Sequence, residues 1–287
     1  MLRSIRIKGL SIVLKSECFV LLRSRTPWLL ILLPAVASVV KMGMIKMKNI
    51  GTQVLSSANS ASETTVTGYG FLVDGLLISL IITYLLFLGY AAYTFAIDRE
   101  QGITRHSIIR STSRSELIIA KYISLCLLAF LSVIVTLLST WLAANLFWDL
   151  GPLIEDGYQI ISVSEINREI ILGLKLALLP LPAFLAFGLL FSVCARSALQ
   201  AVSLAIGAGL FLDIFKSALG DLQHFIFSSF QPSLIDHSYL KDVQRIVSGY
   251  SDVLIDDRIH QLNLWIPIPE ALLFLLITLI VINRRNL

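Results

Sequence analysis

Long apolar stretches separated by short polar segments dominate the pattern of residues along the chain. A helix needs about 20 mostly apolar residues to cross the hydrocarbon core of a bilayer, and six stretches meet that requirement. They lie at about 26–45, 75–97, 122–147, 171–194, 198–218 and 264–282. The pattern predicts an all-α polytopic membrane protein with six transmembrane helices, in which residues 1–287 form a single transmembrane domain.

Composition excludes a soluble protein. Of the 287 residues, 56% are hydrophobic and 15% are charged, whereas a soluble domain is about 45–50% apolar and about 25% charged. The excess of apolar side chains has to face lipid. The six stretches also leave no room for a separate soluble domain, so we expect a multi-pass protein.

The distribution of charge predicts how the helices are oriented. If the N-terminus is cytoplasmic, the segments on that side carry 14 Lys and Arg and four Asp and Glu, whereas the opposite side carries seven basic and thirteen acidic residues. Basic residues concentrate on the cytoplasmic side of membrane proteins. We therefore expect both termini in the cytoplasm and the protein in the plasma (inner) membrane. The same asymmetry explains the net charge of +4 without nucleic acid as a partner.

Two segments outside the apolar stretches have helical periodicity. In residues 1–25, Ser4, Lys8, Ser11 and Lys15 form a polar stripe beside apolar residues, which predicts an elbow helix lying on the inner leaflet; an ordinary cytoplasmic cap is the alternative. In residues 219–263, apolar residues repeat at helical spacing over Asp221–Phe230 and again over 240–250. This extracytoplasmic segment is therefore predicted to form short amphipathic outer helices between the fifth and sixth spans.

Motifs for catalysis are missing from the sequence. It contains no phosphate-binding G-x-x-x-x-G-K-[ST], no G-x-S-x-G and no H-E-x-x-H. We expect no catalytic residues, no metal ligands and no cofactor bound by this chain. Asp236, His237, Asp256, Asp257 and His260 are the one group that leaves an outside metal site open, with solvated loop residues as the other interpretation. Three cysteines cannot all pair, and they show no metal-binding spacing.

Four ionisable residues fall inside the predicted spans: Lys175, Asp213, Lys216 and Glu270. Each lies near the outer end of its helix, and Asp213 and Lys216 share a face at a spacing of i, i+3. Ionisable residues in membrane helices are costly and often functional. One interpretation is that they pair or reach to the membrane surface. The other is a polar ring at the outer mouth of a substrate path.

The cytoplasmic segment 98–116, between the second and third spans, holds the densest pattern. Ser113 and Glu116 form an S-x-x-E capping box, and Gly102 lets the chain turn after the second span. Between them, 103–110 combines Ile103, Ile108 and Ile109 with arginines, which is suited to a short helix that docks into another protein. A lipid-facing connector with basic residues is the alternative.

This segment resembles the cytoplasmic loop of ABC-2 type transporter permeases, in which an acidic residue precedes G-T, an apolar run, S-R and G-K. The matching residues are Glu100, Gly102, Thr104, Ser113, Arg114, Glu116 and Lys121. The sequence departs from the pattern where Ile103 shifts the G-T pair by one residue and where Ala120 replaces Gly. The wider layout of an elbow helix, six spans and outer helices before the last span is also similar.

The resemblance implies the membrane-spanning permease subunit of an ABC exporter, with 98–116 as the cytoplasmic coupling helix. Two permease subunits, as a homodimer or a heterodimer, would pack with two copies of an ATPase subunit, which would hold ATP and Mg. The resemblance implies export or extraction of a substrate. The apolar spans favour an amphipathic, lipid- or peptide-like cargo, and membrane lipids are expected to contact the subunit. The expected ATPase-coupling residues are Glu100, Gly102, Ile103, Thr104, Ile108, Ile109, Arg110, Arg114 and Glu116.

Two other classes of protein stay open on the sequence alone. A gradient-driven carrier or channel would need no ATPase, and it requires buried charges near the middle of the bilayer. An intramembrane enzyme would need His, Asp or Glu residues converging at one depth, for which only the four outer ionisable residues are candidates.

Overall fold

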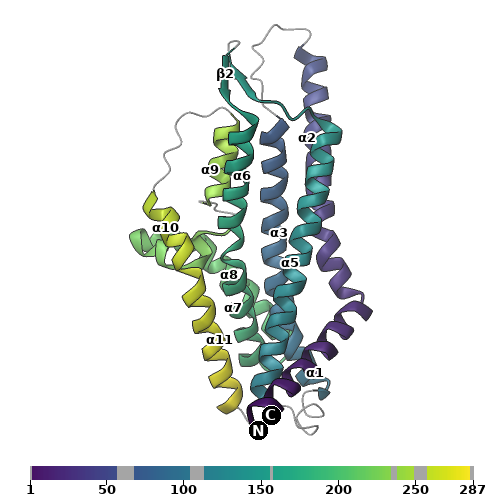
Figure 1. The fold of residues 1–287 in the computed structure, drawn as a ribbon, viewed down its shortest axis with the longest axis vertical. Coiled ribbons are helices and arrows are strands. Elements are labelled where there is room, and N and C mark those ends of the chain that lie inside the picture. Colours follow the sequence, from purple (N-terminus) through teal and green to yellow (C-terminus); the bar gives the residue numbers. More distant parts are fainter. Residues whose placement is uncertain are drawn as a thin grey trace.

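The computed structural model describes residues 2–56, 68–103, 113–155, 158–233, 238–248 and 257–284, and it is a bundle of long helices (Figure 1). Its elements are α1 (Leu2–Arg23), α2 (Thr26–Ser56), α3 (Gly68–Glu100), α5 (Arg114–Phe147), β1 (Leu153–Glu155), β2 (Tyr158–Ile161), α6 (Val163–Leu178), α7 (Leu181–Cys194), α8 (Ala198–Phe215), η1 (Lys216–Phe225), η2 (Phe227–Ser229), α9 (Tyr239–Val247), α10 (Asp257–Trp265) and α11 (Pro267–Arg284).

Within the described ranges, six helical segments are long and apolar enough to cross a membrane, as the sequence predicts. They are Thr26–Ile50, Gly68–Glu100, Arg114–Phe147, Val163–Cys194, Ala198–Phe225 and Gln261–Arg284. All extend beyond the predicted limits at one or both ends, because the helices continue through polar turns outside the apolar stretch. The chain is an all-α polytopic protein in its main architecture.

Three local features differ from the predictions. A short antiparallel hairpin of β1 and β2 joins α5 to α6, in a stretch where no strand is predicted. The fourth span is broken between α6 and α7, since Pro180 and Pro182 lack the N–H groups that would continue the helix. Where an α-helix is predicted over Asp221–Phe230, the chain forms the 3₁₀ segments η1 and η2, with a positive φ of 54° at Gly220.

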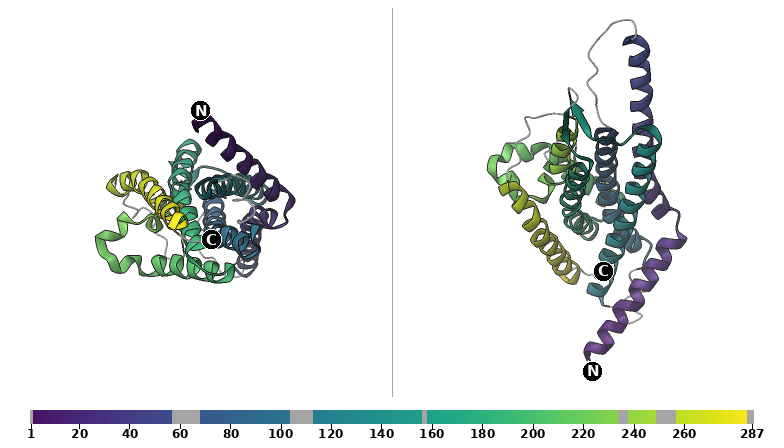
Figure 2. Two further views of the ribbon diagram at one scale, coloured as in Figure 1. Left: turned by 90° about the horizontal axis from the view of Figure 1, so that it is seen from below. Right: turned by 45° about the horizontal axis from the view of Figure 1, so that its top comes forward.

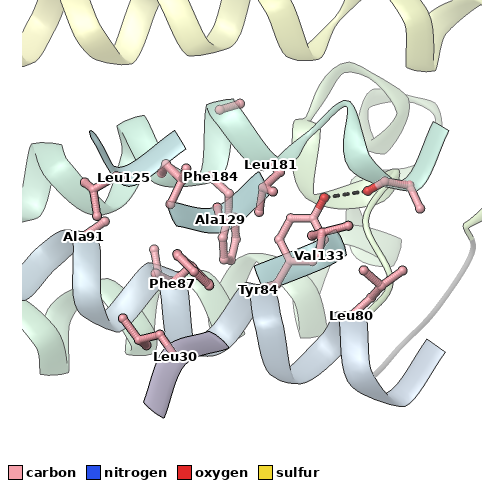
Figure 3. Close-up of a cluster of buried hydrophobic side chains, with 14 of the residues drawn as sticks. Leu30, Leu80, Tyr84, Phe87, Ala91, Leu125, Ala129, Val133, Leu181 and Phe184 are labelled. Atoms are coloured by element: carbon pink, nitrogen blue, oxygen red, sulfur yellow. Dashed lines mark hydrogen bonds between the residues drawn. The ribbon is translucent and has the colours of Figure 1, made fainter. Parts of the chain in front are cut away.

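Helix α3 lies at the centre of the bundle and packs against α2, α5, α7 and α8. Figure 3 shows its side chains Leu80, Tyr84, Phe87 and Ala91 meeting apolar side chains from α2, α5 and α7. Small residues bring α3 and α7 together, because a Cβ at Gly188 would lie 2.9 Å from the Ala91 Cβ. Close approach of this kind through small residues is typical of helix packing in membranes.

Two helices lie beside the bundle. Helix α1 runs obliquely along its outside (Figure 2) and contacts α5, where Val13 packs on Leu117 and Ala120. Helix α1 begins and α11 ends at the same end of the molecule (Figure 1). At the other end α9 packs on α6, and the Tyr239 hydroxyl donates to Glu169 Oε2 at 2.6 Å. Burial and the Glu169 carboxylate raise the pKa of Tyr239, so its hydroxyl stays protonated and can donate this hydrogen bond.

Candidate functional site

A buried lysine ties three helices together at the end of the bundle where α1 begins. The Lys121 ammonium of α5 lies 3.1 Å from Glu17 of α1 and 2.5 Å from Asp98 of α3. Lys121 is only 4% exposed. A buried charge is stable only when it is paired, and here two carboxylates from separate helices provide the pairing.

Arg99 and Glu100, which follow Asp98 in α3, bind the turn between α7 and α8. The Arg99 guanidinium donates to the carbonyl oxygens of Val193 at 3.3 Å and Ala195 at 2.5 Å. Glu100 Oε1 accepts the backbone N–H of Ala198 at 2.8 Å. Ala198 begins α8, and a carboxylate at a helix N-terminus satisfies a free N–H and interacts favourably with the helix dipole. We call Glu17, Asp98, Arg99, Glu100 and Lys121 the lower cluster.

Helix α3 ends immediately after these contacts. Gly102 has φ of +73°, and no heavy atom lies within 4 Å of where its Cβ would be. The residue is therefore required for its left-handed backbone and not for close packing. Ile103 follows with an exposed side chain. Thr104, Ile108, Ile109 and Arg110 lie outside the described residues, so the helix predicted over 103–110 stays a prediction.

The far end of the segment has the capping box that the sequence predicts. Ser113 N–H donates to Glu116 Oε2 at 3.0 Å, and Glu116 N–H donates to Ser113 Oγ at 3.2 Å. Arg114 Nη1 donates to the carbonyl oxygen of Ile282 in α11 at 3.4 Å. These contacts fix where α5 begins and attach this end of the segment to α11.

A second polar group lies where α8 meets η1. The Lys216 ammonium is 2.8 Å from Asp213 Oδ1, donates to Ser233 Oγ at 3.0 Å, and is 3.4 Å from the carbonyl oxygen of Ser228. Lys216 and Asp213 are 1% and 4% exposed. The predicted pairing of these two residues is thus present. Two serines complete it from a stretch of chain that lies apart in sequence.

Glu270 reaches the same stretch of chain from α11. Its Oε2 accepts the backbone N–H of Phe227 at 2.7 Å, one residue before the serine carbonyl that contacts Lys216. The Phe227 ring packs among Phe184, Phe187 and Phe274, with centroids 5.6–5.7 Å away. The segment 227–233 is buried throughout and packs against α7, α8 and α11, and we call it the plug.

The four predicted outer-mouth residues therefore do not lie together. Asp213, Lys216 and Glu270 converge on the plug, whereas Lys175 is exposed on α6. With Ser228, Gln231 and Ser233, the three converging residues form what we call the upper cluster. Sequence reasoning missed these polar plug residues, and the one signal for them was that Ser and Gln interrupt the apolar periodicity after Phe227.

The break between α6 and α7 lies beside the upper cluster. Pro180 has no N–H for the Leu176 carbonyl, which instead accepts Asn263 Nδ2 at 3.3 Å. The Ala177 carbonyl accepts the Tyr84 hydroxyl at 2.6 Å (Figure 3). Tyr84 also lines a cavity of about 20 Å³ together with Asp213, Gln231 and Ser233. Side chains from α10 and α3 thus donate to two of the carbonyl oxygens at the break.

Metal chemistry has no site among the described residues, where no group of three or more His, Cys, Asp and Glu could hold an ion. Asp236, His237 and Asp256 lie outside those residues, and the side chains of Asp257 and His260 are not described either. Cys18, Cys126 and Cys194 are not paired in disulfides.

Comparison with known proteins identifies the family. The family model described as "Protein of unknown function (DUF2705)" matches residues 32–224, and the chain belongs to that family. No curated protein matches the chain, and no solved structure matches it. The matched range includes α3, α5, α7 and α8, which contribute Asp98, Arg99, Glu100, Lys121 and Asp213 to the two clusters.

Proposed function

We propose that this member of the DUF2705 family is the membrane-spanning permease subunit of an ABC transporter, in which a separate ATPase subunit drives export or extraction of a substrate. In this proposal both termini are cytoplasmic, α1 is the elbow helix on the inner leaflet, and 98–116 contains the coupling helix in the ATPase groove. The partner ATPase holds ATP and Mg. A second permease subunit, the same or different, completes the transporter.

The observation that carries the proposal is the set of contacts made by three consecutive residues at the end of α3. Asp98 pairs with Lys121 of α5, which also binds Glu17 of α1. Arg99 and Glu100 bind the α7–α8 turn. A displacement of the end of α3 would therefore act directly on α1, α5, α7 and α8.

Such connectivity is what a coupling segment requires. Coupling between distant sites needs a mechanical element whose position both sites influence. A passive connector between two spans needs only to close the loop, and its polar residues would face water. Here Asp98 pairs with the buried Lys121 of α5, and the Glu100 carboxylate, although solvent-exposed, accepts the first N–H of α8.

The first test is purification of the full chain from its native host in mild detergent, with mass spectrometry of stoichiometric partners. We expect an ATPase with phosphate-binding motifs at a one-to-one ratio. A chain that purifies alone, also after cross-linking, would contradict the proposal and favour a gradient-driven carrier.

The second test is directed at the coupling contacts. Glu100→Ala should remove the bond to α8, and Gly102→Pro should be incompatible with the positive φ of this residue. Each variant should insert and fold but lose at least tenfold of substrate-stimulated ATP hydrolysis. Glu165→Ala, which alters an exposed capping box on α6, is the matched control and should leave hydrolysis unchanged. Full stimulation in both coupling variants would show that 98–116 is only a connector.

A further inference from the structure

Lys216 turns inward at a place where a lysine normally turns outward. Helix α8 has 18 residues, a length of about 27 Å, so Lys216, which directly follows it, lies toward the far end of the candidate membrane crossing. Lysines at such positions extend along the helix and place the ammonium in water. The residues after it, 217–222, are exposed, yet Lys216 is 1% exposed. Its burial therefore depends on the oxygens that receive it.

The receiving group consists of oxygens only. Asp213 Oδ1, Ser233 Oγ and the carbonyl oxygen of Ser228 lie within 3.4 Å of Lys216 Nζ, and an ammonium has three N–H donors for them. The group also has acceptors to spare. Gln231 is 4% exposed, and its Oε1 accepts no hydrogen bond from the described residues. Ser228 Oγ is in the same situation.

Space and apolar surface adjoin these oxygens. The cavity of about 20 Å³ is lined by Asp213, Gln231, Ser233, Tyr84 and Phe184, and Phe184 also belongs to the aromatic group around Phe227. Twenty cubic ångströms suffice for one water. A larger group fits only in the volume that the Lys216 side chain now occupies, and that side chain is long and flexible enough to leave for the exposed surface beside it.

From these observations we infer that the upper cluster is a binding site for the primary ammonium group of a membrane amphiphile, and that the Lys216 side chain fills this site while no ligand is bound. Asp213 is the counter-ion, the plug oxygens of Ser228, Gln231 and Ser233 accept the N–H groups, and the aromatic rings contact the apolar part. The inference rests on the proposed function in that it names the substrate class. Binding itself requires only this chain.

The test measures binding of dodecylamine to the purified full chain in nanodiscs of neutral lipid. Dodecyltrimethylammonium is the matched probe, because it has the same charge and chain but no N–H donor. We expect saturable binding of one dodecylamine per chain and at least tenfold weaker binding of the trimethyl compound. Equal binding of the two probes, or binding that never saturates, would overturn the inference in favour of simple partitioning.

Substitutions then locate the site. Lys216→Met removes the internal competitor and should tighten dodecylamine binding at least tenfold, whereas Lys175→Met, on an exposed lysine, should leave it unchanged. The double variant Asp213→Asn/Lys216→Met leaves no unpaired buried charge and should lose that gain. Binding seen in Lys216→Met and not in the wild-type chain would mean that Lys216 is a permanent partner of Asp213, which overturns the inference. The wild-type contrast between probes needs no variant, and neither result depends on whether an ATPase associates.

Discussion

Charged side chains in this protein have sharply different surroundings, and three lysines illustrate the range. Lys121 and Lys216 are almost completely buried, and each contacts carboxylates at 3.1 Å or less. Lys41 lies 3.6 Å from Asp74, with about a third of each side chain exposed. Removing one partner of a buried ion pair leaves an uncompensated charge, whereas an exposed pair contributes little. The lysines therefore differ in what their loss should cost.

Lys121→Met should destabilise the protein by about 2–4 kcal/mol, because it leaves Glu17 and Asp98 facing each other without the ammonium; the partial exposure of both carboxylates keeps the cost below that of a fully buried pair. Lys41→Met should change stability by less than about 1 kcal/mol. Unfolding in mixed micelles at increasing fractions of sodium dodecyl sulfate measures both. Similar losses in the two variants would mean that the lower cluster is not a buried ionic group.

At the residue scale the sequence predicted part of each cluster. The spacing of Asp213 and Lys216 predicts their pairing, since residues three apart share a helix face, and the S-x-x-E pattern predicts the capping box at Ser113. Glu100 is itself one of the predicted coupling residues, and Arg99 directly precedes it. Their partners on the α7–α8 turn lie more than 90 residues away, and no local pattern encodes such a contact.

The sequence predicts best those helices and strands whose position is set by the local hydrophobic pattern. Six apolar stretches predict six membrane crossings, because a bilayer requires continuous helices of that length. Pro180 and Pro182 encode the break between α6 and α7. Its stability also depends on Tyr84 and Asn263, whose side chains donate from other helices to carbonyl oxygens at the break. The sequence did not predict the plug, because its burial depends on contacts with Glu270, Lys216 and three phenylalanines outside it.

Helix packing gives a prediction with an internal control. A Cβ at Gly188 of α7 would lie 2.9 Å from both the Ala91 Cβ and the Leu88 carbonyl oxygen, whereas a Cβ at Gly207 of α8 would meet no atom within 4 Å. Gly188→Ala should therefore separate α3 from α7 and destabilise the protein by about 1–3 kcal/mol. Gly207→Ala should leave stability unchanged or raise it by up to about 1 kcal/mol, since alanine favours helix.

The same denaturation experiment in detergent micelles measures both alanine variants. Equal effects at the two positions would show that α3 and α7 are not in close contact at Gly188. A loss confined to Gly207→Ala would show instead that the outward face of α8 is packed in the membrane, for example against a second subunit.

For the whole molecule, orientation in the membrane decides whether the lower cluster can meet a cytoplasmic partner. The lower cluster lies at the end of the bundle where α1 begins, and α6 and α7 together cross the molecule from the opposite end. Ser164, near the start of α6, is exposed, and so is Cys194 at the end of α7. The excess of basic residues predicts that the end carrying Cys194 is cytoplasmic.

Two single-cysteine proteins test this orientation. With Cys18 and Cys126 replaced by Ser, Cys194 should react with a membrane-impermeant maleimide only after the cells are permeabilised. Ser164→Cys, introduced in a chain in which all three native cysteines are replaced by Ser, should react in intact cells; a mass shift on a gel measures both. The reverse pattern would place Gly102 and the segment after it outside the cell, where no ATP-hydrolysing subunit can act on them. That result would contradict the permease proposal. It would not affect the proposed amine site at the upper cluster, because that site is tested by binding measurements on the isolated chain.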